Sequence, residues 1–354
     1  MSKIIGVPHP GYYLKDYLEE IQMTQEEFAN RLGITGKQIS LILMGSANIT
    51  PDIALKLSKF MGTSVEVWLN LQTSYDTYMI QLKQEKEYEE EKRIFNFIDR
   101  KFLRELGIIK EKEDKDSAIK KIRTEIQVSS LSLLKNPDMC SLFRTSVNKP
   151  EDETTIVCRN VWVSIAMKLA KEKEVSLFNE EKLISYIPKF RGMTLESPEE
   201  FYPELDKMLC ECGVALVLLP SLSKSNTNGV IKWIESNKVM MALNTRGSYN
   251  DKFWFSFFHE IKHVLQKVKR KVIISENDND SNDDLEVEAD LFARETLIPS
   301  NAYNYLRKYT PFYIKKFAYE IGIHPGIVVG RLQKDNRIKY SQFNDLKEKY
   351  EIRV

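Results

Sequence analysis

Residues 254–265, WFSFFHEIKHVL, place His259, Glu260 and His263 in a stretch that is otherwise almost wholly apolar. A helix that is apolar on nearly every side belongs in the protein interior, because only there does its apolar surface leave water. The two histidines and the glutamate are then buried with it. Buried polar groups need partners, so the fold of this chain has to bring compensating groups to this helix.

The spacing of these residues meets the needs of a hydrolytic metal site. A zinc hydrolase uses neutral imidazoles as ligands and a carboxylate beside the open coordination position. Histidines at i and i+4 lie on one face of a helix, and a glutamate at i+1 reaches the water bound there. We therefore predict zinc ligands at His259 and His263 and a general base at Glu260. A hydrogen-bonded core cluster without metal is the alternative.

A third protein ligand is predicted downstream. The polar loop at 275–284 is followed by a helical pattern, LEVEADLFARETLIP, in which Glu288 lies three residues after Leu285 and four before Phe292. This spacing puts Glu288 on the apolar side of the helix, where a carboxylate calls for a partner such as a metal ion. We predict Glu288 as the third ligand, with Glu286 as its rival.

The first part of the chain shows a different pattern, a series of short helices between residues 10 and 73. The stretch TQEEFANRLGITGKQISLIL at 24–43 begins with Thr24 as a helix cap and breaks at Gly33, where glycine permits a tight turn. Its inward positions are apolar: Phe28, Ala29, Leu32, Ile39, and Ile42 or Leu43. This pattern predicts a helix-turn-helix.

Polar side chains on the outside of this helix pair suit DNA. Lys37, Gln38 and Ser40 on the second helix, with Thr35 at its start, offer donors and acceptors for base edges and phosphates. Gln25 begins the preceding helix and would direct its end at a phosphate. We predict DNA binding through these residues, by a homodimer that recognises a palindromic site at its own promoter. The alternative is a helical hairpin with a polar outer side.

Composition divides the rest of the chain. Residues 76–127 are dense in Lys and Glu with apolar residues at helical spacing, which is typical of a solvated helical connector. The next segment mixes helical patterns with two strand-like runs, VALVLLP at 214–220 and KVMMALN at 238–244. The predicted domains are a DNA-binding domain (1–75), a connector (76–135), an α+β domain (136–300) and a helical extension (301–354).

A weaker copy of the first helix pair lies in this extension. FAYEIGIHPGIVVGRL at 317–332 matches FANRLGITGKQISLIL at 28–43 at Phe, Ala, Gly, Ile and the final Leu. The outward positions of the copy, 325–328, are Pro, Gly, Ile and Val, which read bases poorly. We predict that this pair packs against the protein or a partner and does not read DNA.

Overall charge and hydropathy limit the partners that this chain is expected to bind. The net charge is +1 and the sequence pI is about 7.6, so any DNA contact must come from a local patch. The first residues, MSKIIGVPHPGYY, lack an apolar signal region, and no run approaches the roughly 18 apolar residues of a membrane span. We predict a cytoplasmic protein without membrane contact. Its cysteines are predicted to be reduced and buried: Cys140, Cys158, Cys210 and Cys212.

Both parts of the sequence resemble known families. NTRGSYNDKFWFSFFHEIKHVL followed by EVEADLFARETLIP resembles the ImmA/IrrE metallo-endopeptidases, and the N-terminal part, ending in EVWLNLQ, is similar to HigA-type antitoxins of the XRE helix-turn-helix family. The resemblance implies an all-α, lambda-repressor-like domain followed by an α+β zincin-like domain. It implies zinc on His259, His263 and Glu288, Glu260 as general base, and substrate beside the strand that ends at Asn244.

The departures from the peptidase pattern are small. Lys252 stands where an arginine is common, and Gln266 and Lys267 replace a frequent extra histidine. Two functions are open at this stage. One is a regulatory zinc protease that cleaves or controls a repressor, toxin or antitoxin, with an extended peptide pairing along an edge strand, KVMMAL. The other is an antitoxin-type regulator whose zincin domain only senses a metal or peptide.

Overall fold

The computed structural model describes residues 6–137, 139, 143–144, 152–225, 227–245, 249–267, 272–276 and 284–350. Cys140 and most of the polar loop predicted at 275–284 lie outside these residues. Contacts divide the chain into two compact units, Met1–Glu90 and Glu91–Val354. We describe each unit by itself, and the four domain boundaries given above stay a prediction.

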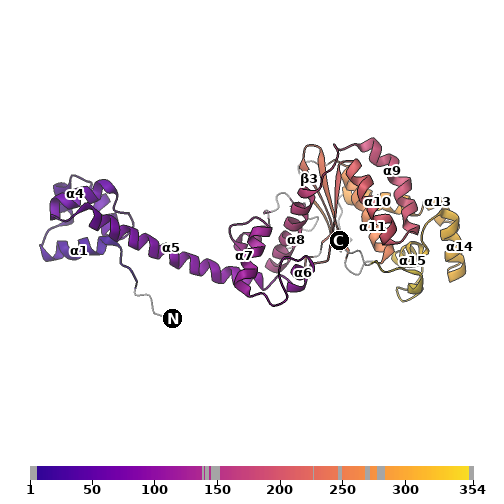
Figure 1. The fold of residues 1–354 in the computed structure, drawn as a ribbon, viewed down its shortest axis with the longest axis horizontal. Coiled ribbons are helices and arrows are strands. Elements are labelled where there is room, and N and C mark those ends of the chain that lie inside the picture. Colours follow the sequence, from indigo (N-terminus) through magenta and orange to yellow (C-terminus); the bar gives the residue numbers. More distant parts are fainter. Residues whose placement is uncertain are drawn as a thin grey trace. The chain divides into compact units, whose positions relative to one another are not determined.

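The first unit consists of helices with well-defined caps (Figure 1). They are α1 (Pro10–Glu20), α2 (Gln25–Leu32), α3 (Gly36–Leu43), α4 (Pro51–Met61) and α5 (Val65–Phe95), the last of which continues into the second unit. The side chains of Thr24, Thr35 and Thr50 accept hydrogen bonds from backbone N–H groups in the first turns of α2, α3 and α4. Gly33 ends α2 in the left-handed conformation, with φ of 65°.

The core of this unit confirms the predicted helix-turn-helix. Phe28 and Ala29 of α2 and Ile39 and Ile42 of α3 are at most 1% exposed, and Leu14 of α1 is buried with them. The small Ala29 lets α2 and α3 approach closely, and the turn at Gly33 sets their angle. The turn and the inward residues are therefore those expected from the sequence.

The charged stretch after residue 76 is helical, as predicted. The second half of α5 is followed by α6 (Arg100–Glu105), α7 (Lys115–Glu125) and a short 3₁₀ turn, η1 (Leu131–Lys135). One of its acidic residues, Glu91, is buried, accepting hydrogen bonds from the Leu131 backbone N–H at 2.8 Å and from Arg123 at 3.4 Å. The end of α5 is thereby fixed to the elements that follow it.

The second unit is built on a mixed five-stranded sheet in the order β1-β5-β3-β4-β2. The strands are β1 (Phe143–Arg144), β2 (Val214–Leu219), β3 (Thr227–Glu235), β4 (Lys238–Asn244) and β5 (Val272–Glu276). β2 and β4 are the strands expected at 214–220 and 238–244, and they run parallel to each other. β3 is antiparallel to both β4 and β5, which places it inside the sheet.

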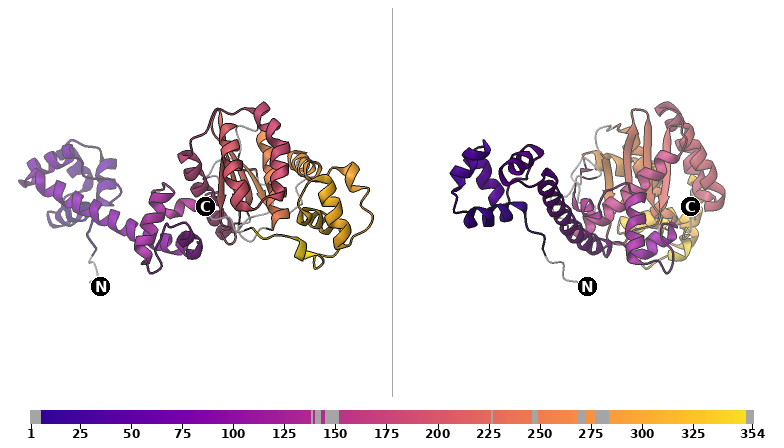
Figure 2. Two further views of the ribbon diagram at one scale, coloured as in Figure 1. Left: turned by 45° about the vertical axis from the view of Figure 1, so that its right-hand side comes forward. Right: turned by 60° about the vertical axis from the view of Figure 1, so that its left-hand side comes forward.

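Helices cover both faces of this sheet (Figures 1 and 2). On one face lies α8 (Glu153–Glu172). On the other face lie α10 (Pro198–Glu211) and α11 (Asn250–Leu265), with α9 (Glu180–Gly192) and the 3₁₀ turn η2 (Met193–Leu195) beyond them. The side chains of Leu216, Ile231 and Met241 join those of α10 and α11 in one hydrophobic core. α11 is therefore a core helix, as its apolar sequence predicts.

One expectation about the sheet is wrong. β4, which contains KVMMAL, is not an edge strand, because β2 pairs with it on one side and β3 on the other. Its backbone groups are already committed to these ladders, so an extended peptide cannot add to it. A peptide that binds by strand addition would have to pair with another strand.

The C-terminal elements hold the start of α11. They are α12 (Asp284–Leu297), α13 (Ser300–Tyr303), α14 (Pro311–Ile321), α15 (Pro325–Lys334) and the 3₁₀ turn η3 (Asn344–Leu346). Gly326 and Gly330 of α15 face Asn250 and Asp251, and a Cβ on either glycine would lie within 2.6 Å of those side chains. Asp251 also forms a buried ion pair with Lys347 at 2.6 Å.

The helix pair α14 and α15 repeats the turn geometry of α2 and α3. Gly322 ends α14 in the left-handed conformation, with φ of 68°, as Gly33 ends α2. The residues of α15 that correspond to the outward Lys37, Gln38 and Ser40 of α3 are Gly326, Ile327 and Val329, and they are buried. The prediction that this copy serves packing is confirmed. Among the described residues, no helix is long and apolar enough to cross a membrane.

Candidate functional site

α11 carries the three residues that opened the sequence analysis. His259 is 7% exposed, and Glu260 and His263 are fully buried. Their burial follows from the neighbouring Trp254, Phe257, Phe258 and Ile261, which insert into the core and draw the helix against the sheet. The imidazole rings of the two histidines stand one turn apart with centroids separated by 4.6 Å.

A carboxylate from α12 completes the group. The Glu286 Oε2 atom lies 3.2 Å from His259 Nε2, and its Oε1 atom lies 3.3 Å from His263 Nε2. One ligand atom from each of the three residues lies within 4.8 Å of the others. Two imidazole nitrogens and a carboxylate oxygen at this spacing match the donor set of a three-ligand zinc site.

The position of Glu288 corrects the predicted ligand set. The Glu288 side chain is 51% exposed and forms an ion pair with Lys262 at 2.9 Å, and it accepts a hydrogen bond from Gln266. The buried face of α12 is formed by Ala289, Ala293 and Leu297. Glu286 lies three residues before Ala289 and so faces α11, whereas Glu288 turns away. The rival residue, Glu286, is therefore the third candidate ligand.

Two further side chains orient the imidazoles. His259 Nδ1 is 2.9 Å from Asp290 Oδ1, and His263 Nδ1 is 2.7 Å from Gln266 Oε1. With each Nδ1 bonded outward, each Nε2 is left to face Glu286, which is the arrangement that fixes the tautomer of metal-binding histidines. Sequence reasoning gave neither residue this role, although Asp290 follows Glu286 at i+4 and thus shares its helix face.

The electrostatics of the His259–His263–Glu286 group favour a positive charge between the two imidazole rings. Burial alone would lower the pKa of His259, but hydrogen bonds to Asp290 and Glu286 raise it to about 10. Burial would raise the pKa of Glu286, but hydrogen bonds from both histidines lower it to about 2. The carboxylates thus stabilise positive charge between the two rings, where a cation would bind.

Glu260 packs directly against the sheet. A Cβ built on Gly229 of β3 would lie 2.1 Å from Glu260 Oε1 and 2.6 Å from its Cδ. Every residue other than glycine at this position would therefore collide with the carboxylate. Gly229 was not singled out from the sequence, because a single glycine in a strand gives no sign of what approaches it.

Asn244 ends β4, as expected. Its side-chain amide donates a hydrogen bond to the Thr227 backbone oxygen at 3.2 Å, which ties the end of β4 to β3. A contact between Asn244 and substrate stays a prediction.

The residues predicted to bind DNA lie in the first unit. Gln25 and Lys37 are exposed, Gln38 and Ser40 are half-buried, and Thr35 caps α3 by accepting a hydrogen bond from the Gln38 N–H at 3.2 Å. Their DNA contacts stay a prediction.

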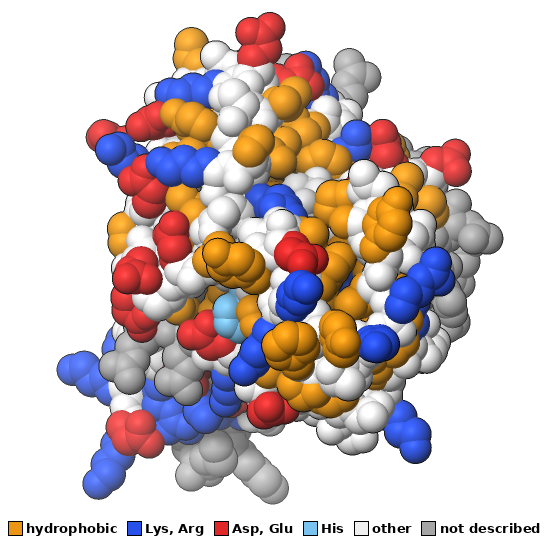
Figure 3. Space-filling model, turned by 90° about the vertical axis from the view of Figure 1, so that its right-hand side faces the viewer, with side chains coloured by type: hydrophobic (Ala, Val, Ile, Leu, Met, Phe, Trp, Pro, Cys, Tyr) orange, Lys and Arg blue, Asp and Glu red, His pale blue; other side chains and the backbone are white. Residues whose placement is uncertain are grey.

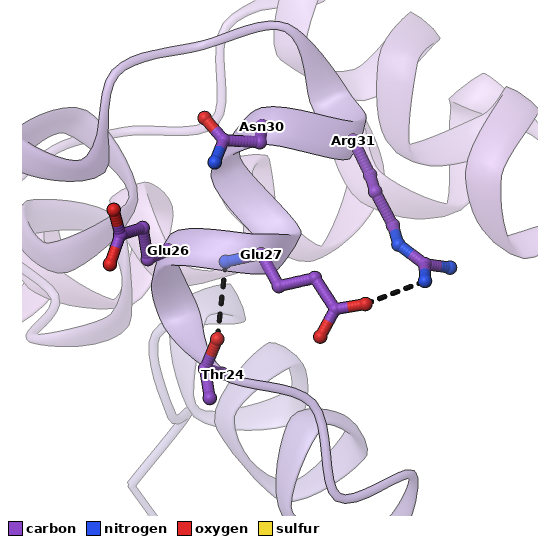
Figure 4. Close-up of a pocket in the computed structure, with 5 residues that line it drawn as sticks. All are labelled: Thr24, Glu26, Glu27, Asn30 and Arg31. Carbon is purple, nitrogen blue, oxygen red and sulfur yellow. Dashed lines mark hydrogen bonds and ion pairs between the residues drawn. The ribbon is translucent and has the colours of Figure 1, made fainter.

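A pocket of about 470 Å³ on α2 is lined by Thr24, Glu26, Glu27, Asn30 and Arg31. Figure 4 shows these five side chains. The pocket contains none of the His259–His263–Glu286 group.

The donor chemistry fits zinc. The three residues offer two nitrogens and one carboxylate oxygen, all buried or half-buried, and their orienting partners Asp290 and Gln266 are in place. Hard cations such as Mg²⁺ prefer all-oxygen sites. The set is therefore suited to zinc or a similar transition metal.

Substitution of the two glutamates should separate the candidate ligands. Glu286→Gln removes the negatively charged candidate ligand that faces both histidines. Zinc affinity should therefore fall by at least about 100-fold, which is more than the loss of a residue that only orients a ligand costs. Glu288→Gln changes an exposed ion pair and should leave zinc affinity within about threefold. Competition with a chelator measures both values. Equal losses in the two variants would contradict the assignment.

Zinc binding should also strengthen as the pH rises. The raised pKa of His259 means that its imidazole is protonated near neutrality in the metal-free protein, and a metal ligand must be deprotonated. Glu286, with its pKa lowered to about 2, needs no such change. Affinity should therefore increase by about one to two decades per pH unit in the neutral range, with proton release. A pH-independent dissociation constant would show that the histidines are not ligands.

Comparison with known proteins identifies both parts of the chain. Residues 14–68 match a helix-turn-helix family model, and residues 211–332 match the model of the IrrE N-terminal-like domain of the M78 peptidases. Over 73 residues the chain is 37% identical to an uncharacterized HTH-type transcriptional regulator, YddM of Escherichia coli (strain K12), covering 21% of this chain and 78% of that protein. This chain belongs to the helix-turn-helix regulators. The part that matches the IrrE N-terminal-like model contains α11 and α12.

Other relatives match the same N-terminal part. Virulence-associated protein I of Dichelobacter nodosus is 35% identical over 72 residues, which are 20% of this chain and 67% of that protein. Among solved structures, an addiction module antidote protein of the HigA family from Coxiella burnetii is 39% identical, with a TM-score of 0.23 over 24% of this chain and 95% of that chain.

Proposed function

We propose that this protein is a DNA-binding regulatory zinc metallopeptidase that cleaves or controls a repressor, antitoxin or toxin partner. The observation that supports it most is the convergence of His259, His263 and Glu286 within 4.8 Å, beside Glu260 on the same helix. The match of residues 211–332 to an IrrE N-terminal-like domain agrees with this chemistry.

The residues of the group would have different roles in hydrolysis. His259, His263 and Glu286 would hold a zinc ion, which would supply Lewis acidity for activating water and polarising a peptide carbonyl. Glu260 accepts the proton that the attacking water gives up, and then returns it to the leaving amine. Asp290 and Gln266 keep the imidazoles turned toward Glu286, so that the Nε2 atoms of both rings remain on the side of the candidate metal position.

The same proposal assigns DNA to the first unit. A dimer would present two copies of α3 to a palindromic operator at the protein's own promoter, in the cytoplasm. Lys37→Ala and Gln38→Ala should each weaken specific binding by about 1–3 kcal/mol if these side chains touch bases. Lys15→Ala, on the exposed side of α1, is the matched control. Wild-type affinity in both α3 variants, at fixed salt, would remove these residues from the interface.

A metal-dependent cleavage assay tests the proposal. The full chain, loaded with zinc, is incubated with the repressor, toxin or antitoxin encoded beside it, and fragments are detected by mass spectrometry. We expect cleavage that a chelator stops and added zinc restores. Absence of fragments from every such neighbour, with zinc bound, would contradict proteolysis.

One observation favours the second candidate, a regulator whose zincin domain only senses a metal or peptide. Glu260 is fully buried against Gly229, so in this conformation bulk water does not reach its carboxylate. A sensor would not need such access, whereas a peptidase must open the site to substrate. Substitution of Glu260 separates the two.

A further inference from the structure

Charge is distributed unevenly along this chain. Residues 301–354 contain 11 Lys and Arg and 5 Asp and Glu, a net charge of +6, whereas residues 1–300 carry −5. The helix-turn-helix segment, residues 1–75, has 6 basic and 7 acidic residues and a net charge of −1. The greater attraction for a polyanion therefore lies in the C-terminal helices.

α14 has an unusual outer surface. Its inner residues Ile314, Phe317 and Ala318 are buried. At 100° per residue, Phe312, Lys316 and Tyr319 fall within about 60° of one another on the opposite side. Phe312 is 70% exposed and Tyr319 is 88% exposed. A surface helix normally presents polar residues there, so two exposed rings separated by about 10 Å along the helix require an explanation.

Basic side chains accompany these rings. Lys315 is exposed next to Lys316, whose side chain is 59% exposed and pairs with Glu320 at 3.8 Å. Lys308, in the segment before α14, places its Nζ 5.1 Å from the centroid of the Tyr313 ring. Figure 3, which shows the side of the molecule where α14 lies in Figure 1, has lysine and arginine side chains lying among hydrophobic ones.

We propose that the α14 face, defined as Phe312, Lys315, Lys316 and Tyr319, binds single-stranded nucleic acid. Exposed rings between cationic side chains are the elements of such a surface, because unpaired bases stack on the rings while the cations neutralise phosphates. A paired duplex would keep its bases stacked inside the helix and leave the rings without contacts. The α14 face would thus add a contact distinct from that of α3.

The composition of the face favours nucleic acid over an acidic protein. Lysine is depleted in the cores of protein interfaces, yet Lys316 lies between the two rings. The rings also project from a convex helix surface, whereas protein hot spots fill well-packed pockets.

Fluorescence anisotropy of the full-length, zinc-loaded protein tests this proposal. The probe is a labelled oligothymidylate of about 20 nucleotides, long enough to span the face, and the comparison probe is a duplex of the same length. Phe312→Ala and Tyr319→Ala should each weaken oligothymidylate binding by about tenfold, and Lys316→Ala should reduce the salt dependence by about 0.7 in log–log slope. All three residues are exposed, so the fold should be unaffected. Tyr340→Ala, 65% exposed and outside the face, is the control and should bind like wild type.

Three results would overturn the proposal. The first is equal oligothymidylate affinity in wild type and in the double variant of Phe312 and Tyr319. The second is an equal loss of duplex affinity in that variant, which would exclude base stacking. The third is displacement of the oligonucleotide by polyglutamate at the same charge concentration, which would assign the face to acidic proteins.

Discussion

Glu260→Gln is expected to abolish peptide cleavage while the fold and the zinc content stay unchanged. Removing a general base lowers the rate of proton transfer by about 10²–10⁴-fold, and the amide of glutamine is nearly the same size as the carboxylate it replaces. Glu260 is not among the three converging ligand groups, so zinc should remain bound. The rate is measured as kcat on the cleaved partner protein, together with zinc content.

Glu288→Gln is the matched control for this substitution. It makes the same chemical change on an exposed carboxylate that pairs with Lys262, and we expect its kcat to be close to that of wild type. Loss of cleavage in Glu288→Gln but not in Glu260→Gln would show that Glu260 is not the general base.

Gly229→Ala should have the second largest effect. A Cβ at 2.1 Å from Glu260 Oε1 is impossible without movement, and the carboxylate must shift by more than about 1 Å to regain ordinary contact. A displacement of this size costs a positioned group on the order of 100-fold in rate. Since the three atoms nearest to the added Cβ all belong to Glu260, kcat should fall while zinc affinity and KM stay nearly constant.

Gly192→Ala provides the control for this change. Gly192 lies in the same unit with a φ of −60°, and nothing lies within 4 Å of an added Cβ. Its alanine variant should retain wild-type kcat. If Gly229→Ala lowers zinc content in proportion to activity, the glycine supports the fold and does not position Glu260.

The sequence predicts the elements whose signals are local. Thr24, Thr35 and Gly33 mark helix ends by chemistry that acts within a few residues, and the structure confirms them. The apolar run around His259 likewise predicts burial of α11. Burial can be predicted from the helix's own sequence, without knowing which elements pack against it. His259, Glu260 and His263 come together through the helix period alone.

The errors arise where distant segments meet. Glu288 was chosen from the spacing of Leu285 and Phe292, but the face of α12 that meets α11 consists of the small Ala289 and Ala293, which a hydrophobicity pattern weights little. The position of β4 inside the sheet depends on β3, whose sequence TNGVIKWIE contains the poor strand formers Asn228 and Gly229. Strand order is set by long-range pairing and is not written in any one segment.

The central claim, that the His259–His263–Glu286 group with Glu260 is a hydrolytic site in a DNA-binding regulator, is tested most directly in a reporter assay. Wild type, Glu260→Gln and His263→Ala are compared on the protein's own promoter, with operator occupancy and zinc content measured in parallel. We predict that Glu260→Gln keeps zinc and occupies the operator, yet fails to relieve repression, as His263→Ala also fails. Regulation by Glu260→Gln that matches wild type, while His263→Ala is defective, would contradict the account and identify a sensor without catalysis.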